Sequence, residues 1–235
     1  MSAAPRSRAM LARMSVDTTE ARLAAALTRM PLFPLPNVVL FPNASMRLHI
    51  FEDRYRAMTR DLLLGERFVA MGLIVEGASP AAERPAVEQI AGVGEVIMAH
   101  ELPDGRFNLV VRGHARVRID QELSSDRPYR LVSASLLPDL PITNPGEVRD
   151  VEQSLRVLIG QLADAIPEGG EPLRQIIAAL ETPEALANVA ASELIADLTV
   201  RQQLLETRDV AERLERVTAE IVSMTARLSA PGVLN

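Results

Sequence analysis

The stretch MPLFPLPNVVLFPNASMRLHIFEDRYRAM, residues 30–58, places four prolines among leucine, valine and phenylalanine and then stops using them. Proline cannot donate a hydrogen bond to a β-ladder, so we expect residues 32–35 at a sheet edge or in an irregular crossing. Residues 38–41 form the first regular strand of this prediction, and residues 46–50 form the second.

A helix is predicted directly behind these strands. Glu52 and Asp53 place negative charge at its start, where the helix dipole favours it, and Gly65 marks its end. The apolar residues that follow at helical spacing are Phe51, Tyr55, Met58 and Leu62. We expect the side chains of Phe51, Tyr55 and Met58 to pack against the sheet and fill its core.

Further β segments are predicted at residues 67–75, 94–101, 106–112, 115–121 and 129–137. Pro103-Asp104-Gly105 has the chemistry of a hairpin turn, because proline sets φ and glycine accepts a positive φ. Alternation places Val117 and Ile119 on one face of their strand. Arg116 and Arg118 then lie on the other face, which we interpret as solvated rather than as a phosphate site.

The composition changes after residue 138. The proline-rich run PDLPITNPG, residues 138–146, indicates a linker, and the rest of the chain has helical periodicity. Thr182-Pro183 predicts a helix start, with a capping side chain followed by proline at the first helical position. One short amphipathic helix is also expected near residues 20–27, within an N-terminal extension.

The basic residues restrict the chemistry that the chain can perform. The sequence contains no lysine, so all 25 basic residues are arginine, and it contains no cysteine. These absences exclude a phosphate-binding loop of the Gly-Lys-Ser/Thr type, Schiff-base chemistry, serine–lysine dyads and thiolate sites. No GxSxG elbow occurs.

Charge and histidine content narrow the function further. The net charge of −6 and the 3% aromatic content argue against a dedicated nucleic-acid binder. His49, His100 and His114 lie in three separate predicted elements, without a spacing typical of zinc ligands. We therefore expect no catalytic, cofactor-binding or metal-binding residues. No segment has the length of a membrane span and no signal peptide is evident, so a cytoplasmic location is expected.

Four segments together resemble the amino-terminal substrate-binding domain of Lon proteases. In chain order they are PLFPLPNVVLFPNASMRLHIFEDRYRAM, LPDGRFNLVVRGHARVRI, PYRLVSASLLPD and RQQLLETRDVAERLERV. The resemblance covers residues 30–228 and implies an α+β fold, with a β-rich PUA-like pseudo-barrel carrying one inserted helix, then a C-terminal α-helical bundle. The expected divisions are extension 1–29, β-rich part 30–138, linker 139–146, bundle 147–229 and tail 230–235.

The resemblance implies a non-catalytic module that binds unfolded or degron-bearing polypeptides. Lon continues into ATPase and peptidase domains, whereas this sequence ends at Asn235, so we expect a stand-alone binding protein, with full-length Lon as a candidate partner beside the polypeptides. An RNA-associated role, by analogy with PUA-like folds, is the alternative. The candidate contact residues are apolar groups beside loop prolines: Leu102, Leu140 and Ile142.

The last predicted helix, within residues 201–228, carries an apolar seam. Its members are Val210, Leu214, Val217, Ile221, Met224 and Leu228. Amphipathic helices most often face their own core, so packing within the bundle is the first interpretation. The alternative is a two-fold homodimer through this seam, with Arg213 and Glu220 as flanking charges.

Overall fold

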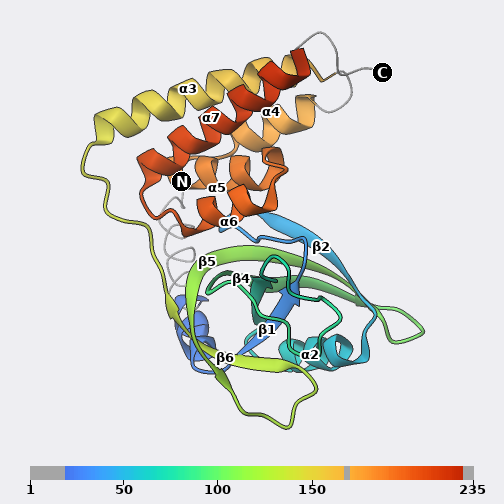
Figure 1. Ribbon diagram of the computed structural model, residues 1–235. Coiled ribbons are helices and arrows are strands. Elements are labelled where there is room, and N and C mark those ends of the chain that lie inside the picture. The colour runs from blue at the N-terminus through green and yellow to red at the C-terminus, as the bar shows by residue number, and fades with distance from the viewer. Residues whose placement is uncertain (1–18, 167–169, 230–235) are drawn as a thin grey trace, which may run out of the picture.

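The computed structural model describes residues 19–166 and 170–229. Figure 1 shows a strongly curved sheet with a stack of helices on one side of it, joined by a long extended segment. The predicted α+β fold is confirmed: a β-rich barrel with one inserted helix precedes the helices. The predicted tail, residues 230–235, and the start of the predicted extension, residues 1–18, lie outside the described residues.

The sheet has six strands in the order β2-β5-β4-β3-β1-β6, with an additional pairing between β5 and β6. The strands are β1 (Met30–Leu35), β2 (Ser45–Ile50), β3 (Phe68–Leu73), β4 (Ile90–Glu101), β5 (Phe107–Leu123) and β6 (Arg130–Leu136). The first half of β5 pairs with β2 and its second half pairs with β6. Five strands therefore close into a ring, and β2 lies beside it.

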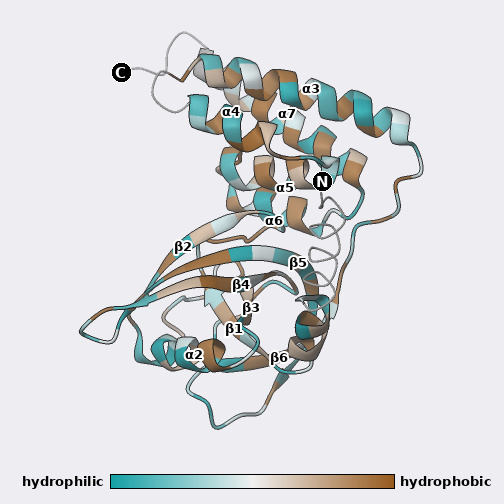
Figure 2. Cartoon of the chain, turned by 180° about the vertical axis from the view of Figure 1, so that it is seen from behind, coloured by the Kyte–Doolittle hydropathy of each residue, from teal (hydrophilic) through white to brown (hydrophobic). Residues whose placement is uncertain are grey.

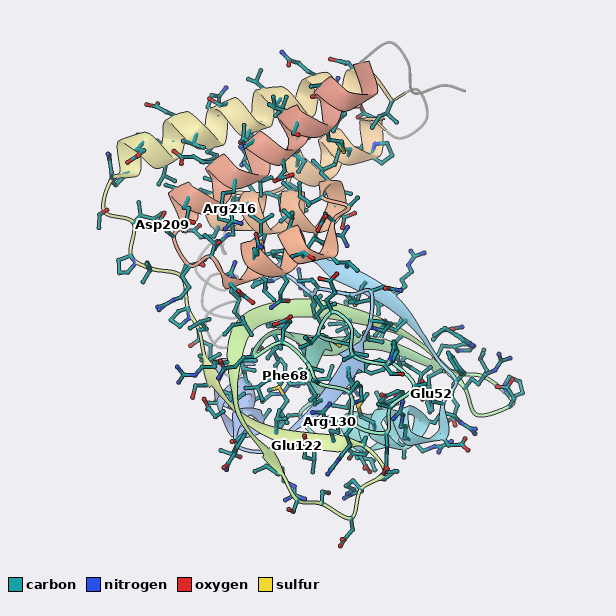
Figure 3. The ribbon with its side chains drawn as sticks, viewed as in Figure 1. Glu52, Phe68, Glu122, Arg130, Asp209 and Arg216 are labelled. Carbon is teal, nitrogen blue, oxygen red and sulfur yellow. The ribbon has the colours of Figure 1, made fainter. Side chains whose placement is uncertain are left out.

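The ring is closed by β5 and β6, where Glu122 and Arg130 lie side by side (Figure 3). Arg130 donates from Nε and Nη2 to the two carboxylate oxygens of Glu122, at 3.1 and 2.9 Å. The β5 strand was expected as two segments but is continuous through Gly113. The predicted hairpin turn joins β4 to β5, with Gly105 at φ 80°.

Residues 32–35 were expected at a sheet edge or in an irregular crossing, and this expectation was wrong. Strand β1 pairs with β3 on one side and with β6 on the other. The Leu35 carbonyl accepts from Ile74 N, so odd-numbered residues of β1 face β3 and even-numbered residues face β6. Pro34 therefore faces the β6 side, where pairing has ended at Leu32. Pro31 faces β3 just before that ladder begins, so neither proline removes a required donor.

Residues 38–41, predicted as the first regular strand, instead cross the sheet in an irregular conformation. This segment presses its backbone against glycines of β4 and β5. A Cβ at Gly92 would lie 1.9 Å from the Leu40 carbonyl oxygen, and one at Gly113 would lie 1.9 Å from that of Phe41. The glycines are required because no side chain fits between the crossing backbone and the sheet.

Helix α2 (Asp53–Leu64) runs from Glu52 to Gly65, as the sequence predicts. Tyr55, Met58 and Leu62 are buried in the barrel core together with Phe33, Phe107 and Leu109. Phe51 was expected in this core, but its side chain is 63% exposed. It precedes the helix and lies over His49 instead, with ring centroids 6.3 Å apart.

The helical part consists of α3 (Pro145–Asp164), α4 (Gly170–Ala178), α5 (Pro183–Leu194), α6 (Leu198–Glu206) and α7 (Val210–Ser229). The Thr182 side chain accepts from Ala185 N, which confirms the predicted cap. The final helix was expected within residues 201–228 as one unbroken element. A break at residues 207–209 instead separates α6 from α7. Asp209 caps the new start by accepting from Glu212 N at 3.0 Å.

The apolar seam of α7 is covered by the chain's own helices. Val210, Leu214, Val217 and Ile221 are at most 2% exposed, and Met224 is half-buried. The side chain of Leu228 lies outside the described residues. The four buried members pack with α3 and α5, so this seam is not available to a second copy and the dimer interpretation was wrong. Figure 2 shows the corresponding apolar and polar faces of the helices.

The helices and the barrel share one of the hydrophobic clusters. Val39, Phe41 and Leu73 from the barrel part pack in the same cluster as the buried residues of α3, α5 and α7. The crossing segment at residues 38–41 therefore has one side on the glycines and the other on the helices. This contact positions the helices against the barrel.

Candidate polypeptide-binding site

A helix at residues 19–27 forms one wall of the candidate site, and Arg22 fixes it to the barrel. The Arg22 guanidinium donates to Glu66 Oε2 and Glu95 Oε1, both at 3.0 Å, and lies over the ring of Phe68. Figure 3 shows Phe68 within the barrel. His114 Nε2 lies 2.9 Å from the second oxygen of Glu95. The helix expected within an extension is thus part of the folded structure.

A cavity of about 770 Å³ lies between this helix, β5, the end of β6 and α5. Its volume is within the range of sites that bind ligands or inserted side chains. Its apolar lining comes from both ends of the barrel sequence: Leu23, Ala24, Pro42, Ala115, Leu136, Leu137 and Pro138. Leu136 is 48% exposed, which is unusual for a large apolar side chain on a strand and leaves part of this lining accessible to a partner.

Polar groups line the cavity where the barrel meets the helices. Arg116 and Asp139 both line it, and Arg116 Nη1 donates to Asp139 Oδ1 at 2.7 Å. Arg116 Nη2 donates to Asn188 Oδ1 of α5 at 2.5 Å. The prediction that Arg116 lies on a solvated face was therefore wrong. This residue is 4% exposed, because α5 and the segment after β6 cover it. Arg118, two residues later, is exposed as predicted.

Asp139 also accepts from Arg213 of α7, at 2.8 Å from Nη1 and 3.0 Å from Nη2. Arg213 is fully buried, so one carboxylate balances two buried guanidinium groups. Burial lowers the pKa of Arg116 to about 10, and the nearby charge of Arg213 lowers it as well. The Nε atoms of both arginines have no hydrogen-bond partner among the described residues. Asp139 therefore ties the barrel to the helices electrostatically.

The sequence-predicted contact residues lie in two separate places. Leu140 and Ile142 are 43% and 37% exposed and border a smaller cleft of about 270 Å³ at the start of α7. Leu102 lies in the turn between β4 and β5, where its backbone N donates to Arg106 O at 2.8 Å. Figures 1 and 2 show this hairpin and the segment before α3 on opposite sides of the molecule. The three residues do not form one surface.

The three histidines lie on three different strands, His49 on β2, His100 on β4 and His114 on β5. His49 Nδ1 lies 2.7 Å from Asn108 Oδ1 on the neighbouring strand, and His114 contacts Glu95. Across residues 19–166 and 170–229, no group of three or more metal-ligating side chains comes together. No helix in these same ranges is long and apolar enough to cross a membrane.

Sequence reasoning missed the cavity because its residues come from distant segments. Only the leucine pair at the end of β6 gave a local signal, since Leu136 and Leu137 directly precede the proline-rich run.

A sequence model described as the ATP-dependent protease La (LON) substrate-binding domain matches residues 29–223. The chain belongs to this family. The Lon protease of Xanthomonas oryzae pv. oryzae is 28% identical to the chain over 190 residues, which is 79% of this chain and 22% of that protein. The Lon protease of Cytophaga hutchinsonii is 25% identical over 188 residues, covering 78% of this chain and 23% of the protease.

Two solved structures share the fold of this Lon-type chain. The N-terminal domain of the Mycobacterium avium complex Lon protease is 18% identical and superimposes with a TM-score of 0.67. It covers 83% of this chain, and 98% of its own length is matched. A Lon N-terminal domain protein from Xanthomonas campestris is 24% identical, with a TM-score of 0.57 and coverages of 82% and 98%. The chain spans about a quarter of the length of the curated Lon proteases it matches.

Proposed function

We propose that the chain is a non-catalytic module that binds unfolded or degron-bearing polypeptides. Membership of the Lon substrate-binding domain family supports this function. The observation that carries the proposal is the largely apolar cavity beside the helix at residues 19–27, with Leu136 exposed at its margin. An unfolded chain offers the large apolar side chains that such a cavity would remove from water.

We propose that the cavity, rather than the three sequence-predicted residues, is the main contact surface. Its lining combines many apolar side chains with the accessible polar groups of Asn43 and Glu184, which would orient a bound backbone. Leu140 and Ile142 lie next along the chain from Asp139 and form a second candidate contact. Leu102 is a third contact, at the far end of the barrel.

We predict that the immobilised chain retains reduced, carboxymethylated α-lactalbumin and does not retain native α-lactalbumin. Retention should persist from 50 mM to 500 mM salt, because apolar burial rather than counterion release would drive it. A single-stranded RNA in a parallel column tests the alternative role. Preferential retention of the RNA, or equal retention of native and unfolded α-lactalbumin, would contradict the proposed function.

A further inference from the structure

Among the described strands, β2 is the one whose outer edge is unpaired along its whole length. Each of β1, β3, β4, β5 and β6 has a neighbour on both sides, whereas β2 pairs with β5 alone. Figures 1 and 2 both show β2 at the margin of the sheet. An open edge presents unpaired backbone N–H and C=O groups, which can hydrogen-bond to an extended chain.

The hydrogen-bond alternation identifies which residues of β2 have free backbone groups. Gly113 N donates to the Ala44 carbonyl at 2.8 Å, so even-numbered residues of this segment bond to β5. Val96 N donates to Arg67 O at 2.9 Å, away from β5. Val111 of β5 lies opposite Val96, so the backbone groups of Val111 point away from β4 and toward Met46 of β2. This agrees with the assignment of even-numbered β2 residues to the β5 side.

The odd-numbered residues of β2 thus direct their N–H and C=O groups to the open edge. These residues are Ser45, Arg47 and His49, and all three side chains are exposed. An added strand would gain three donors and three acceptors in ladder spacing. Main-chain hydrogen bonds of this kind supply the affinity in strand-addition complexes.

The side chains along β2 differ between its two faces. Met46 and Leu48 point toward the barrel core and are only partly buried, so an apolar neighbour would cover them further. On the outer face, none of the ion pairs among the described residues involves Arg47. Glu95, which is in register with Arg112 between β4 and β5, already contacts Arg22 and His114. The outer face therefore favours acidic side chains in an added strand.

We propose that the open edge of β2 binds an extended polypeptide segment as an added strand, with apolar residues facing Met46 and Leu48 and acidic residues facing Arg47. This inference rests on the proposed polypeptide-binding function and specifies a further contact for the same partners. A second copy of the chain is a poorer occupant, because two-fold pairing of β2 would bring two Arg47 side chains together on one face.

The direct test is amide hydrogen exchange of the protein with a ten-residue peptide of alternating valine and glutamate. At saturation, we expect exchange of the Ser45, Arg47 and His49 amides to slow at least about ten-fold, as new ladder bonds form. The Met46 and Leu48 amides already bond to β5 and should change little. Binding without this alternating protection would overturn the inference.

A matched pair of variants separates backbone pairing from side-chain charge. Arg47→Pro removes a donor that faces the open edge and leaves the ladder to β5 intact, which edge strands tolerate. We expect it to weaken peptide binding at least ten-fold, whereas Arg47→Ala should weaken it by about three-fold or less. Equal affinities for the two variants would contradict strand addition.

A peptide control covers the case in which Arg47→Pro fails to fold. The same peptide, N-methylated at alternate residues so that its inward donors are lost, should bind the unaltered protein at least ten-fold more weakly. Retention of unfolded α-lactalbumin without edge protection would refute strand addition and leave the proposed function standing. Light scattering tests whether a second copy occupies the edge instead. A molar mass that rises with protein concentration, and stays at the monomer value in Arg47→Pro, would assign the edge to a second copy.

Discussion

Replacing Asp139 by asparagine is expected to destabilise the protein by about 3–5 kcal/mol, because removing one partner of a buried ion cluster leaves uncompensated charge. Asp139 is the only carboxylate that pairs with Arg116 or Arg213 among the described residues, and both guanidinium groups are at most 3% exposed. Asparagine keeps the shape of the side chain and removes its charge. The free energy of unfolding from a urea titration measures the loss.

The control for this variant is Asp164→Asn, which removes a carboxylate that pairs with Arg174 at the surface and is 73% exposed. It should change the unfolding free energy by less than about 1 kcal/mol. Adding Arg213→Met to Asp139→Asn removes one of the orphaned charges, so the double variant should lose less than the sum of the single variants. An Asp139→Asn loss no larger than that of the control would show that the cluster does not hold the barrel to the helices.

Gly113→Ala is the second substitution with a large expected effect. The new Cβ would lie 1.9 Å from the Phe41 carbonyl oxygen and 3.3 Å from Pro42 Cα, and backbone cannot yield as a flexible side chain does. The crossing segment would have to lift from the sheet, which also opens its contact with the helices. We expect a loss of about 3 kcal/mol or more, at or above the upper end of ordinary overpacking.

Gly160→Ala is the matched control, since its new Cβ would lie 3.7 Å from the nearest atom, Arg174 Nη1. Gly160 lies inside α3, where alanine is the better helix former, so this variant should gain about 0.5–1 kcal/mol. Urea titrations of both variants compare the two effects. A Gly113→Ala protein as stable as the unaltered one would mean that the crossing segment does not press on β5.

Local sequence signals predicted the local structure. Gly105 takes the positive φ that the hairpin requires, and Thr182 caps α5, because turns and caps depend on neighbouring residues. The pairing of β1 was not predictable in this way. Whether Pro34 removes a ladder bond depends on where β6 begins, and the pairing of Leu32 with Arg130 joins residues about one hundred positions apart.

The candidate site was less predictable than the fold. Alternation placed Arg116 and Arg118 on the same face of β5, and the sequence offered no sign that helices cover only Arg116. Its partners Asp139 and Asn188 come from later segments, as does Arg213, which shares Asp139 with it. The seam of α7 carried a clear pattern, but apolar spacing alone does not say whether the chain's own helices or a second copy covers it.

The most direct measurement of the central claim is the affinity of unfolded α-lactalbumin for two tryptophan variants, determined by isothermal titration calorimetry. Ala24 and Ala25 are both exposed on the helix at residues 19–27, and of the two only Ala24 lines the cavity. Ala24→Trp should fill the cavity and weaken binding at least about ten-fold, while Ala25→Trp should bind as the unaltered chain does. Binding to the unaltered chain should also show a negative heat-capacity change from apolar burial. Equal affinities for the two variants, with the loss appearing instead when Leu102, Leu140 and Ile142 are replaced by serine, would contradict the assignment of the cavity as the polypeptide-binding site.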